Sequence, residues 1–162
     1  MVACERMVHV VHADLSEVAF LLGTWRGSGE GEWPRGEPFA YAEEMTFEEV
    51  GDAFLLYAQR SWTIEDEMPI HLERGFLRPA GHGRVELVLA HPLGVAEVAE
   101  GTVRGGVIEV GTTAVARTGT AASVTELTRR IELHGDELRY ELHMAMHDIG
   151  LVSHVRSSLT RA

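Results

Sequence analysis

The chain has a single cysteine, Cys4, so it can form neither an internal disulfide nor a zinc site built from several cysteines. It also has no apolar run of the roughly 18 residues that a membrane helix needs. Residues 1–15 carry acid and histidine and lack a long apolar stretch followed by a small-residue cleavage site, so they do not read as a secretory signal. We therefore expect a cytoplasmic protein that is not bound to a membrane.

Basic residues are also few. The 162 residues include 14 Lys and Arg against 25 Asp and Glu, which gives a formal net charge of −11. Phosphate backbones are bound by clustered basic side chains, and no such cluster occurs here, so the charge balance argues against nucleic acid and against anionic membrane surfaces as partners. With 45% hydrophobic residues, the composition suits one globular domain with its own core.

Most of the chain alternates apolar and polar residues with a period of two, as β-strands do. Turn signals interrupt the alternation at intervals of roughly 8 to 15 residues, and no helical pattern lies between the strands to make a parallel crossover. The sequence therefore predicts an all-β antiparallel fold. Alternation alone leaves a sandwich and a barrel open, and the short helix expected before the first strand favours a barrel of about ten strands, of the lipocalin or fatty-acid-binding type. The clearest alternating sets are Val85, Leu87 and Leu89; Leu127, Arg129, Ile131 and Leu133; and Leu138, Tyr140, Leu142 and Met144.

One short helix is expected before the first strand. Asp14-Leu15-Ser16-Glu17 has the spacing of a capping box, and the apolar residues up to Leu22 could form one face before Gly23 ends the run. A capped helix of about two turns in front of a meander of hairpins closes one end of many ligand-holding barrels. The expected division is a flexible arm over residues 1–12 and one barrel domain over residues 13–162.

The segment Gly23–Gly29 carries three glycines around Trp25. Glycine inside a strand marks a bend or the close approach of another backbone, and Trp25 would fill one end of the barrel with a large apolar ring. Neither a following helix nor a Lys-Ser/Thr pair is present, so a phosphate-binding loop is a poor alternative. Gly23, Trp25, Gly27 and Gly29 are therefore read as structural.

Nine histidines are many for this length. We expect His71, His82 and His134 at turns, in contact with solvent. His143 and His147 lie four apart, and on one strand they would share a face and could hold a metal ion, although no third ligand is evident.

His91 and His154 are placed to face a cavity. His91 begins a turn after a strongly apolar strand, and His154 lies between Val152 and Val155. A histidine in apolar surroundings must pair its ring nitrogens or ligate something. Two interpretations stay open for His154 at this point: a core histidine satisfied by hydrogen bonds, or the axial imidazole of a haem iron whose other side is open to a small molecule.

Motifs for nucleophilic or paired-acid catalysis are lacking. The chain has no Gly-x-Ser-x-Gly, and Cys4 lies in the expected arm. Glu43-Glu44 and Glu48-Glu49 are neighbours in strands, so the members of each pair point to opposite faces. We expect these acids on the solvent side.

Several segments, taken together and in order, resemble the nitrobindin family of small haem-binding β-barrels. The resemblance extends over nearly the whole chain from about residue 15. Its most specific segments are Leu21–Gly29, with a Gly-x-Trp-x-Gly-x-Gly signature, Pro38–Glu44, Val85–Pro92 followed by Gly94, Glu97–Thr102, and Gly135–Tyr140 with Met144.

The resemblance implies that each subunit holds one ferric haem b, with His154 as the iron ligand. Met144 and His91 match positions that line the haem pocket. Arg35 stands where relatives often have a haem-contacting Thr, and it could meet a haem propionate. The resemblance further implies that the protein binds nitric oxide and isomerises peroxynitrite to nitrate, and it leaves a homodimer open.

Two alternatives come from other classes of protein. An iron-free barrel could carry a fatty acid or another small apolar ligand. A metal-dependent enzyme could use His143 and His147.

Overall fold

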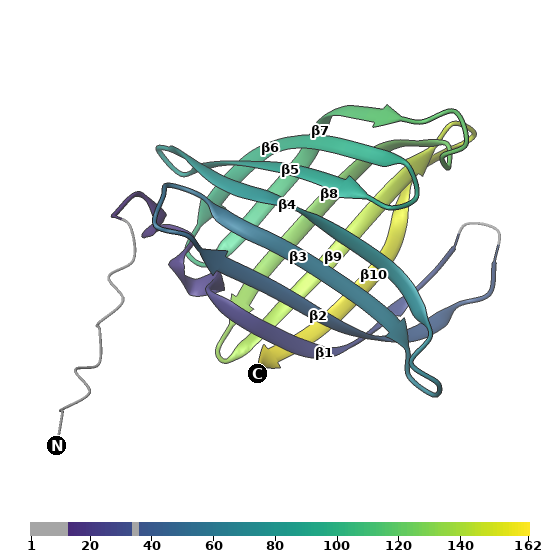
Figure 1. The fold of residues 1–162 in the computed structure, drawn as a ribbon, viewed down its shortest axis with the longest axis horizontal. Helices are drawn as coiled ribbons and strands as arrows, with labels where there is room; N and C mark the ends of the chain where they lie inside the picture. The colour runs from purple at the N-terminus through teal and green to yellow at the C-terminus, as the bar shows by residue number, and fades with distance from the viewer. Residues whose placement is uncertain (1–12, 34–35) are drawn as a thin grey trace, which may run out of the picture.

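The computed structural model describes residues 13–33 and 36–162, which form ten antiparallel strands in a closed barrel (Figure 1). Each strand pairs with its neighbours along the chain, and β1 pairs with β10 to close the barrel. The predicted all-β barrel of about ten strands is confirmed, whereas the arm expected over residues 1–12 lies outside the described residues. The strands are β1 (Gly23–Gly31), β2 (Phe39–Glu49), β3 (Leu55–Thr63), β4 (Pro69–Gly81), β5 (Arg84–His91), β6 (Val95–Arg104), β7 (Val107–Arg117), β8 (Val124–His134), β9 (Glu137–Met146) and β10 (Ile149–Arg161).

The segment before β1 corrects the expected helix. It consists of two 3-10 turns, η1 (Ala13–Leu15) and η2 (Ala19–Leu21). Within the described part of the chain, no helix is long and apolar enough to span a membrane. Backbone hydrogen bonds join residues three apart, as from Leu21 N–H to the carbonyl of Val18. Leu15, Val18 and Leu21 are fully buried, and a spacing of three places them on one side of a 3-10 turn. The burial pattern therefore favours the tighter turn over an α-helix.

Trp25 fills the end of the barrel that these turns cover. Its ring is buried, and the guanidinium carbon of Arg161 lies 4.2 Å from the ring centroid. The glycines beside it allow β10 to lie close to β1. A Cβ at Gly27 would overlap the carbonyl oxygen of Ser158 on β10, and a Cβ at Gly29 would overlap the carbonyl oxygen of Arg156 on the same β10 strand.

The middle of the interior is polar. Glu43, Glu73, Glu97 and Arg129 are each at most 3% exposed. Glu43 corrects the expectation that this acid lies on the solvent side. It shares the inward face of β2 with buried apolar residues, whereas Glu44 points outward to the exposed Arg26 and Arg60.

Neutral groups hold the Glu43 carboxylate. The side chains of Gln59 and Ser157 donate hydrogen bonds to its two oxygens. Burial nevertheless raises the pKa of Glu43 to about 7, because the loss of water outweighs these two bonds, and the nearby Glu73 carboxylate adds to the rise. The carboxyl is therefore largely protonated at pH 6, where an exposed glutamate is ionised.

Glu43→Gln should make the stability of the barrel depend less on pH. A group whose pKa is about 7 in the folded chain and 4.5 when solvated binds protons better in the folded state. Its contribution therefore lowers the free energy of unfolding as pH rises through that window, by on the order of 3 kcal/mol at most. The amide cannot ionise and can still bond to Gln59 and Ser157. The variant should match the wild type at pH 5 and exceed its stability at pH 8.

Urea unfolding at pH 5, 6, 7 and 8 measures this difference. Glu48→Gln, at an exposed position of the same strand, is the matched control and should keep the wild-type pH dependence. Parallel pH dependences for Glu43→Gln and the wild type would contradict the assignment.

Candidate functional site

A cavity of about 300 Å³ opens at the barrel end opposite the 3-10 turns. In an antiparallel meander the odd-numbered strands end together, and the connections after β1, β5 and β7 supply Trp33, Leu93 and Ala122 to the cavity wall. Nearly fully buried polar groups, among them Glu73 and Arg129, form its floor. Further apolar wall residues are Phe39, Ile70, Val95, Val124, Leu127, Leu142, Met144 and Val155.

His154 lines this cavity from a bulge in β10. The register between β9 and β10 shifts between Ser153 and Val155, so the strand gains a residue there. The ring Nδ1 lies 2.7 Å from the carbonyl oxygen of Glu32, and the Glu32 amide donates to the His154 carbonyl, also at 2.7 Å. The ring of Trp33 packs edge-on against the imidazole, with centroids 5.3 Å apart.

The hydrogen bond between His154 Nδ1 and the Glu32 carbonyl determines which nitrogen of the imidazole carries the proton. A carbonyl oxygen only accepts, so Nδ1 must be the donor and Nε2 holds the lone pair of the neutral ring. Burial lowers the pKa of His154 and the nearby His71 adds to the effect, although the bond to Glu32 opposes it. The imidazole is therefore neutral at pH 7, with its basic nitrogen available to a metal ion.

The other predicted site residues fall in three places. Met144 and His91 line the same cavity, Met144 from β9 and His91 from the end of β5. Arg35 lies outside the described residues. The glycine motif, from Gly23 to Gly29, does not contribute to the cavity lining within the described part of the chain.

A network of charged residues lies beneath the cavity. The Arg129 guanidinium binds both oxygens of Glu97, at 2.6 and 2.7 Å, and its Nη2 also lies 3.1 Å from Glu73 Oε2. Its Nε donates to the hydroxyl of Tyr140 at 3.2 Å. The Tyr57 hydroxyl donates to the second oxygen of Glu73, Oε1, at 2.7 Å. Every group in this network therefore has a partner, as burial requires.

The same contacts keep both acids ionised. Burial alone would raise the pKa values of Glu73 and Glu97, but Arg129 and the neighbouring histidines outweigh it and hold both below the usual range. Two carboxylates thus face one guanidinium. With neutral histidines the network has an excess of one negative charge.

Sequence analysis missed this network although the alternation contained a signal for it. Arg129 stands within an alternating apolar set, on the same face as Leu127 and Ile131, which are buried. A charge on the buried face of a strand requires a buried counter-charge, which could have directed attention to Glu97 on the inward face of β6.

The expectation that His71 is solvated at a turn was wrong. β4 already begins at Pro69, so His71 lies within the strand and shares the inward face of Glu73. His82 and His134 are exposed, as expected. His91 Nδ1 lies 3.2 Å from His71 Nε2, and this contact joins β4 to β5.

The predicted pairing of His143 and His147 is also wrong. β9 ends at Met146, so His147 lies in the following turn, and His143 lies between the inward-pointing Leu142 and Met144. A shared strand face for the two histidines therefore does not exist.

Comparison with known proteins agrees with this geometry. Residues 14–161 match the family model described as "THAP4-like, heme-binding beta-barrel domain". The chain is 48% identical over 155 residues to a protein named peroxynitrite isomerase 2 from Mycobacterium marinum, covering 93% of this chain and 96% of that protein. It is 40% identical over 155 residues to a Nocardia farcinica protein named peroxynitrite isomerase, covering 93% and 92%.

A solved structure gives the same result for the fold. The crystal structure of Rv2717c from M. tuberculosis aligns with a TM-score of 0.87 and 39% identity, covering 94% of this chain and 99% of that one. The strand order, the cavity with its histidine, the family match and these relatives all agree: the chain belongs to the nitrobindin family of THAP4-like, haem-binding β-barrel domains.

Proposed function

We propose that the barrel of residues 13–162 binds one ferric haem b through His154, binds nitric oxide, and isomerises peroxynitrite to nitrate. The observation that carries the proposal is the bond between His154 Nδ1 and the Glu32 carbonyl, which leaves Nε2 as a ligand in a largely apolar cavity. The relatives named peroxynitrite isomerase support the reaction. A homodimer and a cytoplasmic location stay predictions of the sequence.

The residues present fit a haem. A volume of about 300 Å³ for the open cavity lies at the lower end of the usual range for ligand pockets, roughly 300–1,000 Å³. Its apolar wall suits a porphyrin face, and the His154 imidazole with its fixed tautomer would supply one ligand to the iron. Two further histidines line the wall: His91 has both ring nitrogens engaged, with His71 and Glu97, and His71 Nε2 is engaged with His91.

The chain's own groups have three tasks in the proposed reaction. His154 ligates and Glu32 orients it, because a hydrogen bond to Nδ1 fixes the ring and raises the basicity of Nε2. Trp33 packs edge-on against the imidazole and restricts its rotation. The apolar wall, including Leu142 and Met144, keeps water out.

A bound ferric haem supplies a Lewis acid that accepts an anion. Peroxynitrite and nitrate contain the same atoms and carry the same charge. The overall reaction therefore needs no electron source.

Transport of a fatty acid by an iron-free barrel is the second candidate, favoured by the apolar wall. An ionised fatty-acid carboxylate in the cavity would need a cation or several hydrogen-bond donors in place of water. Among the described residues of the lining, the guanidinium is that of Arg129, already bound by Glu73 and Glu97. Removing either partner from it would leave a buried charge unpaired. The network therefore favours the haem proposal over a fatty-acid carrier.

His154→Ala should weaken haem binding by more than about tenfold, because the variant lacks the axial ligand. A hemin titration followed at the Soret band measures the affinity, and stopped-flow absorbance follows the decay of peroxynitrite with and without hemin. His143→Ala, on the neighbouring strand, is the control and should bind hemin as the wild type does. A His154→Ala variant with full hemin affinity, or a wild type whose spectrum does not respond to hemin, would overturn the proposal.

Trp33→Ala should lower the hemin affinity by roughly tenfold, within the range seen when groups that orient a metal ligand are removed. The loss arises because the edge-on contact with His154 disappears. Trp33→Phe should restore most of the affinity, since it keeps an aromatic ring in place. Trp62→Ala, which removes a tryptophan outside the cavity, is the matched control, and an equal loss there would show that the effect is not specific to the site.

A further inference from the structure

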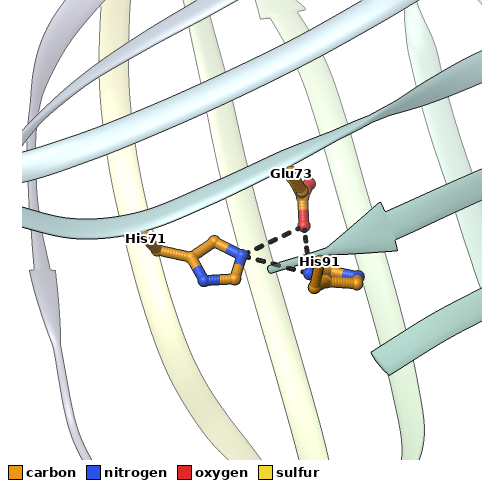
Figure 2. Close-up of side chains that lie close together, drawn as sticks. All are labelled: His71, Glu73 and His91. Carbon is orange, nitrogen blue, oxygen red and sulfur yellow. Dashed lines mark hydrogen bonds and ion pairs between the residues drawn. The ribbon is translucent and has the colours of Figure 1, made fainter. Parts of the chain in front are cut away.

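We propose that His71, Glu73 and His91 form a second metal site, for a divalent transition-metal ion of the zinc class, in the barrel wall and apart from the haem ligand His154. Figure 2 shows the two imidazoles and the carboxylate converging on one point, from β4 and from the end of β5. The three donor atoms are His71 Nε2, His91 Nδ1 and Glu73 Oε2.

The spacing of these atoms matches a tetrahedral ion. The two nitrogens lie 3.2 Å apart, and they lie 3.5 Å (His71) and 3.4 Å (His91) from the carboxylate oxygen. Zinc binds nitrogen and oxygen at about 2.0–2.1 Å, which places tetrahedral donors about 3.3–3.4 Å from one another. The triangle therefore has the size of one face of a zinc coordination sphere.

The donor set also fits. Two histidines and one glutamate make up the protein ligands of several catalytic zinc sites, where a fourth position stays open. All three residues line the cavity, so a water molecule or a small anion could take that position.

Groups around the triangle hold its ligands in the orientation that a metal requires. His91 Nε2 lies 2.8 Å from Glu97 Oε1, and a carboxylate only accepts, so Nε2 carries the proton and the lone pair of Nδ1 points to the other donors. In zinc sites, a ligating histidine typically donates its other ring N–H to a carboxylate in this way. Glu73 is fixed by the Tyr57 hydroxyl on Oε1 and by Arg129 on Oε2.

The charge of the surroundings favours a cation. Glu73 and Glu97 carry two negative charges against the single positive charge of Arg129, and Glu73 and His91 are at least nine-tenths buried on the side chain. A divalent ion would more than offset this excess negative charge and leave one positive charge for a small anion at the open position. Arg129 at 3.1 Å from the ligating oxygen weakens that donor, so we expect a micromolar rather than a picomolar site.

The test is a titration of the tag-free, hemin-free full chain with Zn²⁺ by calorimetry and with Co²⁺ by visible absorbance. We expect one ion per chain, with the intense visible bands of four-coordinate Co²⁺. His71→Ala should weaken binding by about tenfold or more. His71 is the ligand to replace first because its side chain is 30% exposed, so the fold should tolerate the change. Thermal unfolding without metal checks this.

Two controls separate this site from the haem site. His154→Ala should keep the full zinc affinity while losing hemin binding. His147→Ala, at an exposed turn, should change neither. A wild type that binds no Zn²⁺, zinc binding that His71→Ala leaves unchanged, or zinc binding that His154→Ala abolishes would each overturn the proposal.

Discussion

The seam between β1 and β10 is the constraint on which the site depends. The register runs from Trp25 opposite Arg161 to Gly31 opposite Val155, and one further backbone bond joins Glu32 to His154. The Glu32 carbonyl that fixes the imidazole is therefore supplied by closure of the barrel, across 122 positions of sequence. Glycines at the seam permit the close approach of the two strands. The glycine motif thus acts on the site at a distance, through the backbone that it brings together.

Closure also separates the interior into layers with different chemistry. At one end the 3-10 turns and Trp25 form an apolar plug, at the other the cavity wall is apolar, and ionised groups occupy the space between. Ions buried between apolar layers must be paired, because their desolvation is costly. Arg129 meets this need by binding carboxylates from two different strands, β4 and β6, and so fixes the cavity floor. A rigid floor is what a site needs if its ligands are to be held in one geometry.

The alternation of apolar and polar residues predicted the strands, because it depends only on which face of a strand is buried. The choice of a barrel over a sandwich came from the expected N-terminal helix and from the family resemblance. The alternation could not predict which inward residues meet. His71, His91, Glu97 and Arg129 come from four strands, and their meeting depends on register and on curvature around the barrel. The prediction of an N-terminal helix was wrong for a different reason. A capping pattern describes local preference, whereas tertiary burial at every third residue selected the 3-10 geometry. His154 could be singled out from its apolar neighbours, but its tautomer required the Glu32 carbonyl.

Of the three histidines that line the cavity, His154 and His91 differ in the group that accepts their ring N–H, and this difference suits two kinds of metal. The neutral carbonyl of Glu32 accepts the ring N–H of His154, whereas the Glu97 carboxylate accepts the ring N–H of His91. A carboxylate partner gives an imidazole more anionic character and makes it a stronger donor to a small divalent ion. A carbonyl partner does this less, so an iron ligated by His154 would keep more of its Lewis acidity. Capture of an anion such as peroxynitrite would call for that acidity, because a bound ferric haem would serve as the Lewis acid. On the two proposals made above, the hydrogen-bond partners suit His154 to the anion-binding iron and His91 to a divalent ion.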